Sequence, residues 1–212
     1  MPEDLVFYTH PMSRGRIVRW MLEEVGQPYR TEVLDYATTM KAPEYLAINP
    51  MGKVPALRHG EAVVTEAAAI CAYLADAFPA AGLAPPQGQR AAYYRWLFFA
   101  AWPLEQAATN KALGLVVPAG REAMAGFGSL DAVLQTLEQA ISHDRYVAGE
   151  KFSAADVYLG AQIGWGMQFG TIEKRPAFER YWDRIGTRTA ALRAKAIDDA
   201  LLPQQPVPKP TA

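Results

Sequence analysis

The sequence predicts an α/β domain followed by a domain built only of helices. Short β-rich runs and helical runs alternate in the first part of the chain, and Gly60-Glu61 joins two β-rich runs as a hairpin. A segment rich in proline and glycine then interrupts the periodic pattern. Beyond it, each periodic stretch has helical spacing. We therefore expect domains at 1–79 and 90–202, a linker at 80–89 and a proline-rich tail at 203–212.

The first domain alternates strands with helices. Apolar residues at helical spacing after Ser13, with a stop at Gly26, predict its first helix. Thr65 is expected to cap its last helix, which runs to about Phe78. The predicted elements are a strand at 5–8, a helix at 13–25, a strand at 29–34, a loop at 35–48 with one helical turn at 43–46, strands at 54–58 and 62–64, and a helix at 65–78. The order βαβ then ββα is typical of a thioredoxin-like domain.

The second domain is expected to be a series of helices. They cover residues 90–114, 129–143, 153–164, 176–187 and 189–202. Pro103 predicts a bend in the first of them, because proline lacks the N–H that an α-helix needs. Ser153 and Asp156 form a capping box at the start of the third, with a role in folding and none in chemistry.

The composition is that of an ordinary globular protein. Of 212 residues, 50% are apolar and 20% are charged, with a net charge of -1, so we expect no nucleic-acid and no membrane partner. The run Trp96–Leu104 is too short to span a bilayer, and the acidic start of the chain does not resemble a signal peptide. Cys71 is the only cysteine, and the three histidines lack metal-ligand spacing. We therefore expect a cytoplasmic protein with neither an intrachain disulfide nor a metal site.

The stretch most informative about function is Asn49–Leu57, in which Pro55 starts an apolar strand. A cis Val54–Pro55 bond would turn the main-chain N–H and C=O of Val54 outward, where an extended peptide could pair with them. Glu66 opens the following helix, so its carboxylate suits an ammonium group and the first N–H groups suit a carboxylate. A small peptide with an acidic group and a free amine at one end would fit, and glutathione is such a peptide.

Four motifs in this order resemble the cytosolic glutathione transferases, of the bacterial type with an active-site serine. They are Phe7–Arg14, Asn49–Leu57, Thr65–Ile70 and Phe152–Asp156, and the resemblance covers about Leu5 to Leu202. It implies a thioredoxin-like N-terminal domain, an all-α C-terminal domain and a homodimer. It also implies glutathione as co-substrate, no metal, and a small hydrophobic electrophile as the second substrate.

The resemblance implies roles for individual residues. Ser13 falls on the catalytic serine, Pro55 on the cis-proline, and Val54 on the residue that pairs with the cysteinyl backbone of glutathione. The γ-glutamyl site falls on Glu66 and Ala67. The family usually has serine at the second of these positions, so about 0.5–1.5 kcal/mol of affinity is lost if no other group replaces the hydroxyl.

Two further residues extend the predicted site into its surroundings. Lys53 is expected to reach the glycyl carboxylate of glutathione, although an exposed loop lysine needs no such partner. Trp102 is expected in the pocket for the second substrate, although most aromatic residues on so long a helix belong to the core.

The expected role of Ser13 is to donate a hydrogen bond to the sulfur of glutathione. A hydrogen bond to a charged partner contributes about 1.5–3 kcal/mol, which corresponds to a fall of roughly one to two units in the thiol pKa. Arg14 and Arg16 would add positive potential. Ser13 would also cap the helix, and the two roles are compatible. Tyr8 is the alternative donor, because other branches of the family use a tyrosine there, but packing in the sheet is the simpler explanation.

These observations predict a glutathione transferase that conjugates the thiolate of glutathione to small apolar electrophiles. Two alternatives stay open. One is a non-catalytic protein of the same fold that binds a protein partner, which Ala67 slightly favours. The other is a glutathione-dependent isomerase, whose serine-rich motif is only partly present. A thiol-disulfide reductase is disfavoured, because the sequence lacks Cys-x-x-Cys.

Overall fold

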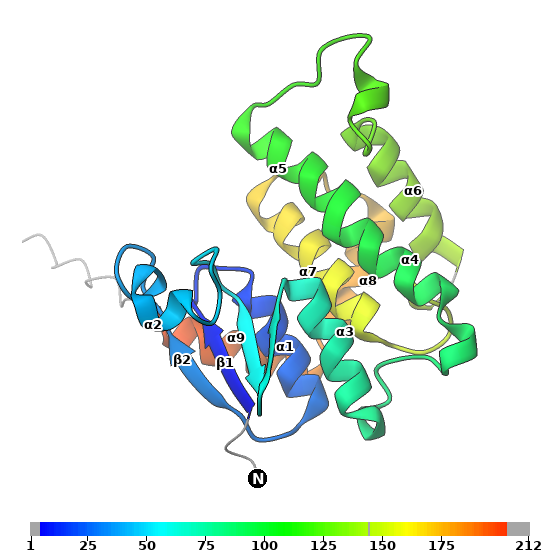
Figure 1. The fold of residues 1–212 in the computed structure, drawn as a ribbon. Helices are drawn as coiled ribbons and strands as arrows, with labels where there is room; N and C mark the ends of the chain where they lie inside the picture. The colour runs from blue at the N-terminus through cyan, green and yellow to red at the C-terminus, as the bar shows by residue number, and fades with distance from the viewer. Residues whose placement is uncertain (1–4, 144, 203–212) are drawn as a thin grey trace, which may run out of the picture.

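The computed structural model describes residues 5–143 and 145–202, which form an N-terminal domain with a sheet and a helical C-terminal domain (Figure 1). The predicted fold class is therefore confirmed. The chain passes between the two parts through a proline-rich segment with two short 3-10 turns, Pro79–Ala81 and Gln87–Gln89. The predicted tail, residues 203–212, lies outside the described residues.

The N-terminal domain is built on a four-stranded sheet. Its strands are β1 (Leu5–Thr9), β2 (Arg30–Val33), β3 (Ala56–His59) and β4 (Ala62–Thr65). They lie in the order β2-β1-β3-β4, with β1 parallel to β2 and the other neighbours antiparallel. Tyr8 pairs with Ala56 and Ala56 pairs with Thr65. The end of β1, the start of β3 and the end of β4 therefore meet at one end of the sheet.

Helices cover the sheet and form the second domain. They are α1 (Gly15–Val25), α2 (Pro43–Leu46), α3 (Ala67–Ala77), α4 (Ala91–Phe99), α5 (Glu105–Leu113), α6 (Leu130–His143), α7 (Ala154–Phe169), α8 (Pro176–Gly186) and α9 (Thr189–Ala200). Short 3-10 turns lie at Thr39–Lys41 and Glu122–Met124. Over the part of the chain that the structure describes, no helix is long and apolar enough to cross a membrane.

Side chains of β1 alternate between the two faces of the sheet, as a pleated strand requires. Phe7 belongs to the main core, together with Ile17 of α1 and Ile70 of α3. Tyr8 belongs to a smaller cluster with Tyr45 of α2. The sheet thus lies between α1 and α3 on one face and the α2 region on the other.

Pro103 lies in a π-helical turn, Ala100–Leu104, which joins α4 to α5 in one continuous helical run. Proline inside a helix removes a hydrogen bond and crowds the preceding turn. A π-helical turn is a common local adjustment to such a disruption. The sequence predicted the long helix and the site of the irregularity.

Helix α7 is longer than predicted. It continues past the expected end at Gly164, through Gly166, to Phe169. A Cβ at Gly164 would collide with the ring of Trp182, and one at Gly166 with Ile172. The absence of these side chains allows close packing with α8 and the segment before it, which offsets the low helix propensity of glycine.

Helix α3 starts later than predicted. Thr65 is the last residue of β4, and Glu66 occupies the N-cap position with a φ of 66°. In residues 5–143 and 145–202, Glu66 is the one non-glycine residue with a positive φ. This conformation is sterically costly for a residue with a Cβ and is most often kept at functional sites. The expected cap at Thr65 was therefore wrong, because the chain needs this turn between β4 and α3.

The two domains pack through α1 and α3, which contact α7, and through α9, which lies along α1 (Figure 1). Ion pairs join α1 to α9, among them Arg16 to Asp199 at 2.7 Å and Arg19 to Asp198 at 3.1 Å. The C-terminal helix thus holds the helix that begins directly after the first strand.

Candidate active site

The residues expected to bind glutathione converge at one end of the sheet. Ser13 follows β1, Val54 precedes β3 and Glu66 follows β4. The strand register brings these three chain segments to the same end. Lys53 and Ala67 adjoin two of them in the sequence. Trp102 belongs to the other domain.

Ser13 lies in the loop before α1 and makes two local hydrogen bonds. Its Oγ accepts from the N–H of Gly15 at 3.0 Å and donates to the carbonyl of His10 at 2.7 Å. The sequence predicted a helix from Ser13, but the helix begins at Gly15. The serine hydroxyl turns the chain before the first helical residue. A hydroxyl has one proton, so donation to a ligand requires release of the His10 carbonyl. An unpaired buried carbonyl costs about 1–3 kcal/mol, and less where water reaches it.

The loop from His10 to Ser13 is held from two sides. A Cβ at Gly15 would collide with the buried hydroxyl of Thr9, so the helix can start here only with glycine or after a local shift. On the other side, Nε of Arg16 donates to the carbonyl of Pro11 at 2.6 Å. The same guanidinium binds Asp199 on α9. The position of Ser13 therefore depends on β1 near the start of the chain and on α9 near its end.

The Val54–Pro55 peptide bond is cis, as the resemblance implies. The carbonyl of Lys53 accepts hydrogen bonds from the Tyr45 hydroxyl at 2.5 Å and from Asn49 Nδ2 at 2.8 Å, which fixes the approach to the bond. Burial raises the pKa of Tyr45 to about 12, so this donor stays protonated. No hydrogen bond joins the main chain of Val54 to another described residue. Its N–H and C=O therefore remain open to an added extended chain.

The start of α3 offers donors and an acid together. Glu66 is exposed, and no side chain caps this end of the helix. The first N–H groups of a helix have no partner within it, so they can bind an anion. Ala67, where the family usually has serine, is 7% exposed and belongs to the core. The site thus pairs a carboxylate with free main-chain donors but has no hydroxyl at this position.

Two tyrosines lie near the end of β1, and only one faces the loop of Ser13. Tyr8 is buried against Tyr45, with ring centroids 5.6 Å apart, which agrees with the expectation that it packs in the sheet. Tyr36, which the sequence did not single out, donates its hydroxyl proton to the carbonyl of Met12 at 3.0 Å. It comes from the segment between β2 and α2, where no periodic pattern marks a functional residue.

The two arginines expected to add positive potential are both paired with carboxylates. Arg14 binds Glu105 of α5 at 2.8 Å, and Arg16 binds Asp199 of α9 at 2.7 Å. Lys195 and Arg16 hold the pKa of Asp199 below its ordinary value. The second domain thus supplies opposite charges that reduce the potential of both arginines, and the expectation of added positive potential stays a prediction.

Two lysines flank the turn before the cis bond. Lys53 is exposed and forms no ion pair with another residue that the structure describes. Lys41 was not considered from the sequence, and its Nζ donates to the carbonyl of Gly52 at 2.7 Å. Both ammonium groups belong to this end of the sheet, where they can attract a carboxylate.

Trp102 lies in the π-helical turn and is 51% exposed. A Cβ at Gly126 would collide with its ring, so the indole rests against the segment between α5 and α6. An ion pair from Arg14 to Glu105 connects the serine loop to the next turn of the same helical run. The expected pocket role of Trp102 stays a prediction.

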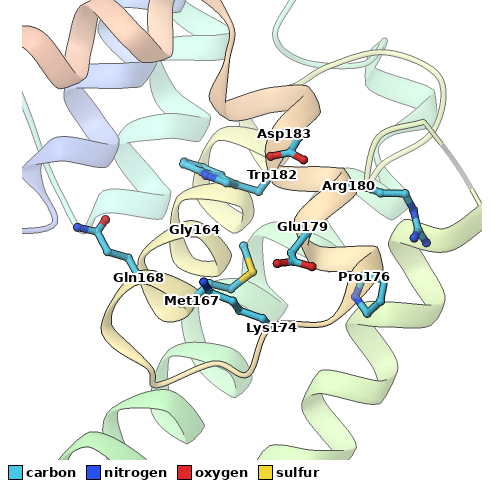
Figure 2. Close-up of a pocket in the computed structure, with 9 residues that line it drawn as sticks. All are labelled: Gly164, Met167, Gln168, Lys174, Pro176, Glu179, Arg180, Trp182 and Asp183. Carbon is cyan, nitrogen blue, oxygen red and sulfur yellow. The ribbon is translucent and has the colours of Figure 1, made fainter.

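Other candidate chemistry lies apart from this site. Cys71 is fully buried in α3, and burial raises the pKa of its thiol, so it is a poor nucleophile. No group of three metal-ligating side chains occurs in residues 5–143 and 145–202. A cavity of about 630 Å³ lies between α7 and α8, where Met167, Trp182 and Glu179 line it (Figure 2). None of the predicted site residues borders it.

Comparison with known proteins agrees with this geometry. Residues 12–77 match the glutathione S-transferase N-terminal domain, and residues 104–188 match the glutathione S-transferase C-terminal domain. Glutathione S-transferase GST-4.5 of Xanthomonas campestris is 30% identical over 208 residues, covering 90% of this chain and 98% of the relative. Glutathione S-transferase 3 of Zea mays is 26% identical over 223 residues, covering 98% and 99%.

Solved structures give the same result. A glutathione transferase from Methylococcus capsulatus superposes with a TM-score of 0.77 at 27% identity, covering 92% of this chain and 99% of the other. A glutathione transferase homologue from Sulfitobacter with bound glutathione has a TM-score of 0.74 at 28% identity, covering 95% and 100%. From the matched sequence models, the Xanthomonas relative and the shared fold, we conclude that the chain belongs to the glutathione S-transferase family.

Proposed function

We propose that the protein is a cytoplasmic, homodimeric glutathione transferase that conjugates the thiolate of glutathione to small apolar electrophiles. The observation that carries this proposal is the open main chain of Val54 at a cis-proline, at the same end of the sheet as Glu66 and Ser13. The bound glutathione in the Sulfitobacter homologue supports the choice of ligand.

In this proposal, glutathione lies as an added strand beside Val54. Its cysteinyl N–H and C=O pair with the Val54 main chain, as in other cases of strand addition. The γ-glutamyl ammonium binds Glu66, and its carboxylate binds the first N–H groups of α3 near Ala67. The glycyl carboxylate lies near Lys53. These contacts hold the peptide by atoms other than its sulfur.

The sulfur then faces the loop of Ser13, where the chemistry takes place. The thiol releases its proton to water, and a hydrogen bond from Ser13 stabilises the thiolate that remains. The thiolate attacks the electrophilic carbon, a carbon–sulfur bond forms, and the leaving group departs with its bonding electron pair. Trp102 is the proposed apolar wall for the electrophile.

Glutathione should stabilise the protein, because a ligand that binds only the folded state shifts unfolding by mass action. We expect about 2.7 kcal/mol at a hundredfold excess over the dissociation constant. Thermal unfolding with and without millimolar glutathione measures this, and S-methyl glutathione tests whether binding needs the free thiol. Turnover of a generic aryl halide then tests catalysis.

The two measurements separate the proposal from its alternatives. A thermal shift with no turnover of any aryl halide would favour a non-catalytic glutathione-binding protein. Absence of a thermal shift would reject the assignment of Val54 and Glu66 to a glutathione site and favour the partner-binding alternative, to which Ala67 points.

A further inference from the structure

We propose that Tyr36 is a second catalytic residue of this site, and that its phenol donates a hydrogen bond to the sulfur of bound glutathione beside Ser13. This inference rests on the proposed function and adds to it a residue outside the four motifs of the resemblance. It replaces Tyr8 as the tyrosine of the site.

Tyr36 is placed on the serine loop by two contacts. Its hydroxyl donates to the carbonyl of Met12, the residue directly before Ser13, at 3.0 Å. Its ring lies against the His10 ring, with centroids 4.5 Å apart. The phenol is therefore fixed over the loop that the sulfur would approach. Tyr8, by contrast, packs in the cluster on the α2 face of the sheet.

The proton of Tyr36 is easier to redirect than that of Ser13. The Ser13 hydroxyl donates its proton to the part-buried carbonyl of His10 at 2.7 Å. Redirecting that proton leaves the carbonyl without a donor. The Tyr36 bond to Met12 is exposed, so water can take its place on the carbonyl. Tyr36 is itself 49% exposed, which leaves its phenol accessible to a ligand.

The surroundings keep Tyr36 protonated, as a donor requires. Burial raises the pKa of the Tyr36 phenol, while the nearby Ser13 hydroxyl and the charge of Arg14 oppose that rise. The titratable and charged groups that face the phenol are thus His10 and Arg14, and Arg14 is paired with Glu105. A phenol that keeps its proton and binds the residue directly before Ser13 can donate to the same sulfur as the serine hydroxyl.

The test compares Tyr36→Phe with wild type and with Tyr146→Phe, which removes the hydroxyl of a partly buried tyrosine between α6 and α7. Ultraviolet absorbance of the thiolate, followed against pH, gives the pKa of bound glutathione in each protein. We expect Tyr36→Phe to raise this pKa by about one unit and to lower turnover near neutral pH by up to about tenfold. The dissociation constant for glutathione should change by less than about twofold, and Tyr146→Phe should behave as wild type.

The outcomes distinguish this inference from the function on which it rests. If wild type binds glutathione and Tyr36→Phe leaves the thiolate titration unchanged, Tyr36 is not a donor and the inference is overturned. A weaker affinity at an unchanged thiol pKa overturns it too, because Tyr36 would then bind another part of the ligand. If wild type itself binds no glutathione, the proposed function fails first.

Discussion

In the proposed function, the hydroxyl of Ser13 serves both folding and chemistry. The N–H of Gly15 donates to its oxygen, and the oxygen keeps this role when its proton turns from the His10 carbonyl to a sulfur. The expected cap by Ser13 was wrong, because Arg14 occupies the N-cap position and no side chain caps this helix. The hydrogen bond that Ser13 accepts from the Gly15 N–H and the proposed catalytic bond use different parts of the same hydroxyl, so the two are compatible.

Ser13→Ala should raise the pKa of bound glutathione by about one to two units, because the thiolate loses a hydrogen bond. Near neutral pH, the thiolate fraction and turnover should fall by roughly ten- to a hundredfold. Loss of the hydrogen bond from the Gly15 N–H should cost about 1 kcal/mol of stability, so thermal unfolding must first show a folded variant. Ultraviolet titration of the thiolate is the direct measurement. A titration identical to that of wild type would mean that Ser13 serves only the local turn.

At the scale of elements, the start of α7 depends on one buried carboxylate. Oδ1 of Asp156 accepts from the Val147 N–H and the Tyr181 hydroxyl, both at 2.8 Å. Oδ2 accepts from the Ser153 N–H at 2.9 Å, which completes the predicted capping box. The carboxylate thus joins α7 to α8 and to the segment before α7. The sequence showed the cap but not the links to Val147 and Tyr181.

Asp156→Ala should destabilise the protein by about 3–5 kcal/mol, because four buried donors, the Ser153 hydroxyl among them, lose their acceptor at once. Urea unfolding measures this loss. Asp183→Ala is the matched control, since its carboxylate is exposed on α8 and should change stability by less than about 0.5 kcal/mol. Similar losses for the two variants would show that the buried hydrogen bonds contribute little net stability.

At the scale of the whole molecule, helix α9 helps to hold the loop of Ser13. Asp199 of α9 binds Arg16, and Arg16 in turn holds the carbonyl of Pro11. Arg14 likewise joins the loop to α5 through Glu105. The serine loop is therefore positioned by the helical domain as well as by the sheet.

The proposed homodimer has a candidate contact surface on α4. Tyr94 and Phe98, one turn apart, are 43% and 72% exposed. An exposed apolar strip of this kind favours association. Sedimentation at micromolar concentration should give twice the 23.3 kDa of one chain, and Phe98→Glu should shift the protein toward the single chain by placing a charge in the interface. Wild type that sediments as a single chain would reject the dimer.

The sequence by itself determined the order of the elements, the capping box and the cis-proline turn. Each depends on residues close together in the chain: apolar spacing, a Ser-x-x-Asp pair, or a proline at the head of a strand. These local signals also brought Val54 and Glu66 into one hypothesis, and the family resemblance added Ser13 to it.

Only the tertiary structure decided which charges and hydroxyls meet at the site. Arg14 and Arg16 are paired by carboxylates from distant helices, and Tyr36 reaches the serine loop from a segment without periodicity. The positive φ of Glu66 arises where β4 turns into α3. Such contacts join residues far apart in the chain, and no local pattern specifies which distant side chain will lie opposite, since that depends on how whole elements pack.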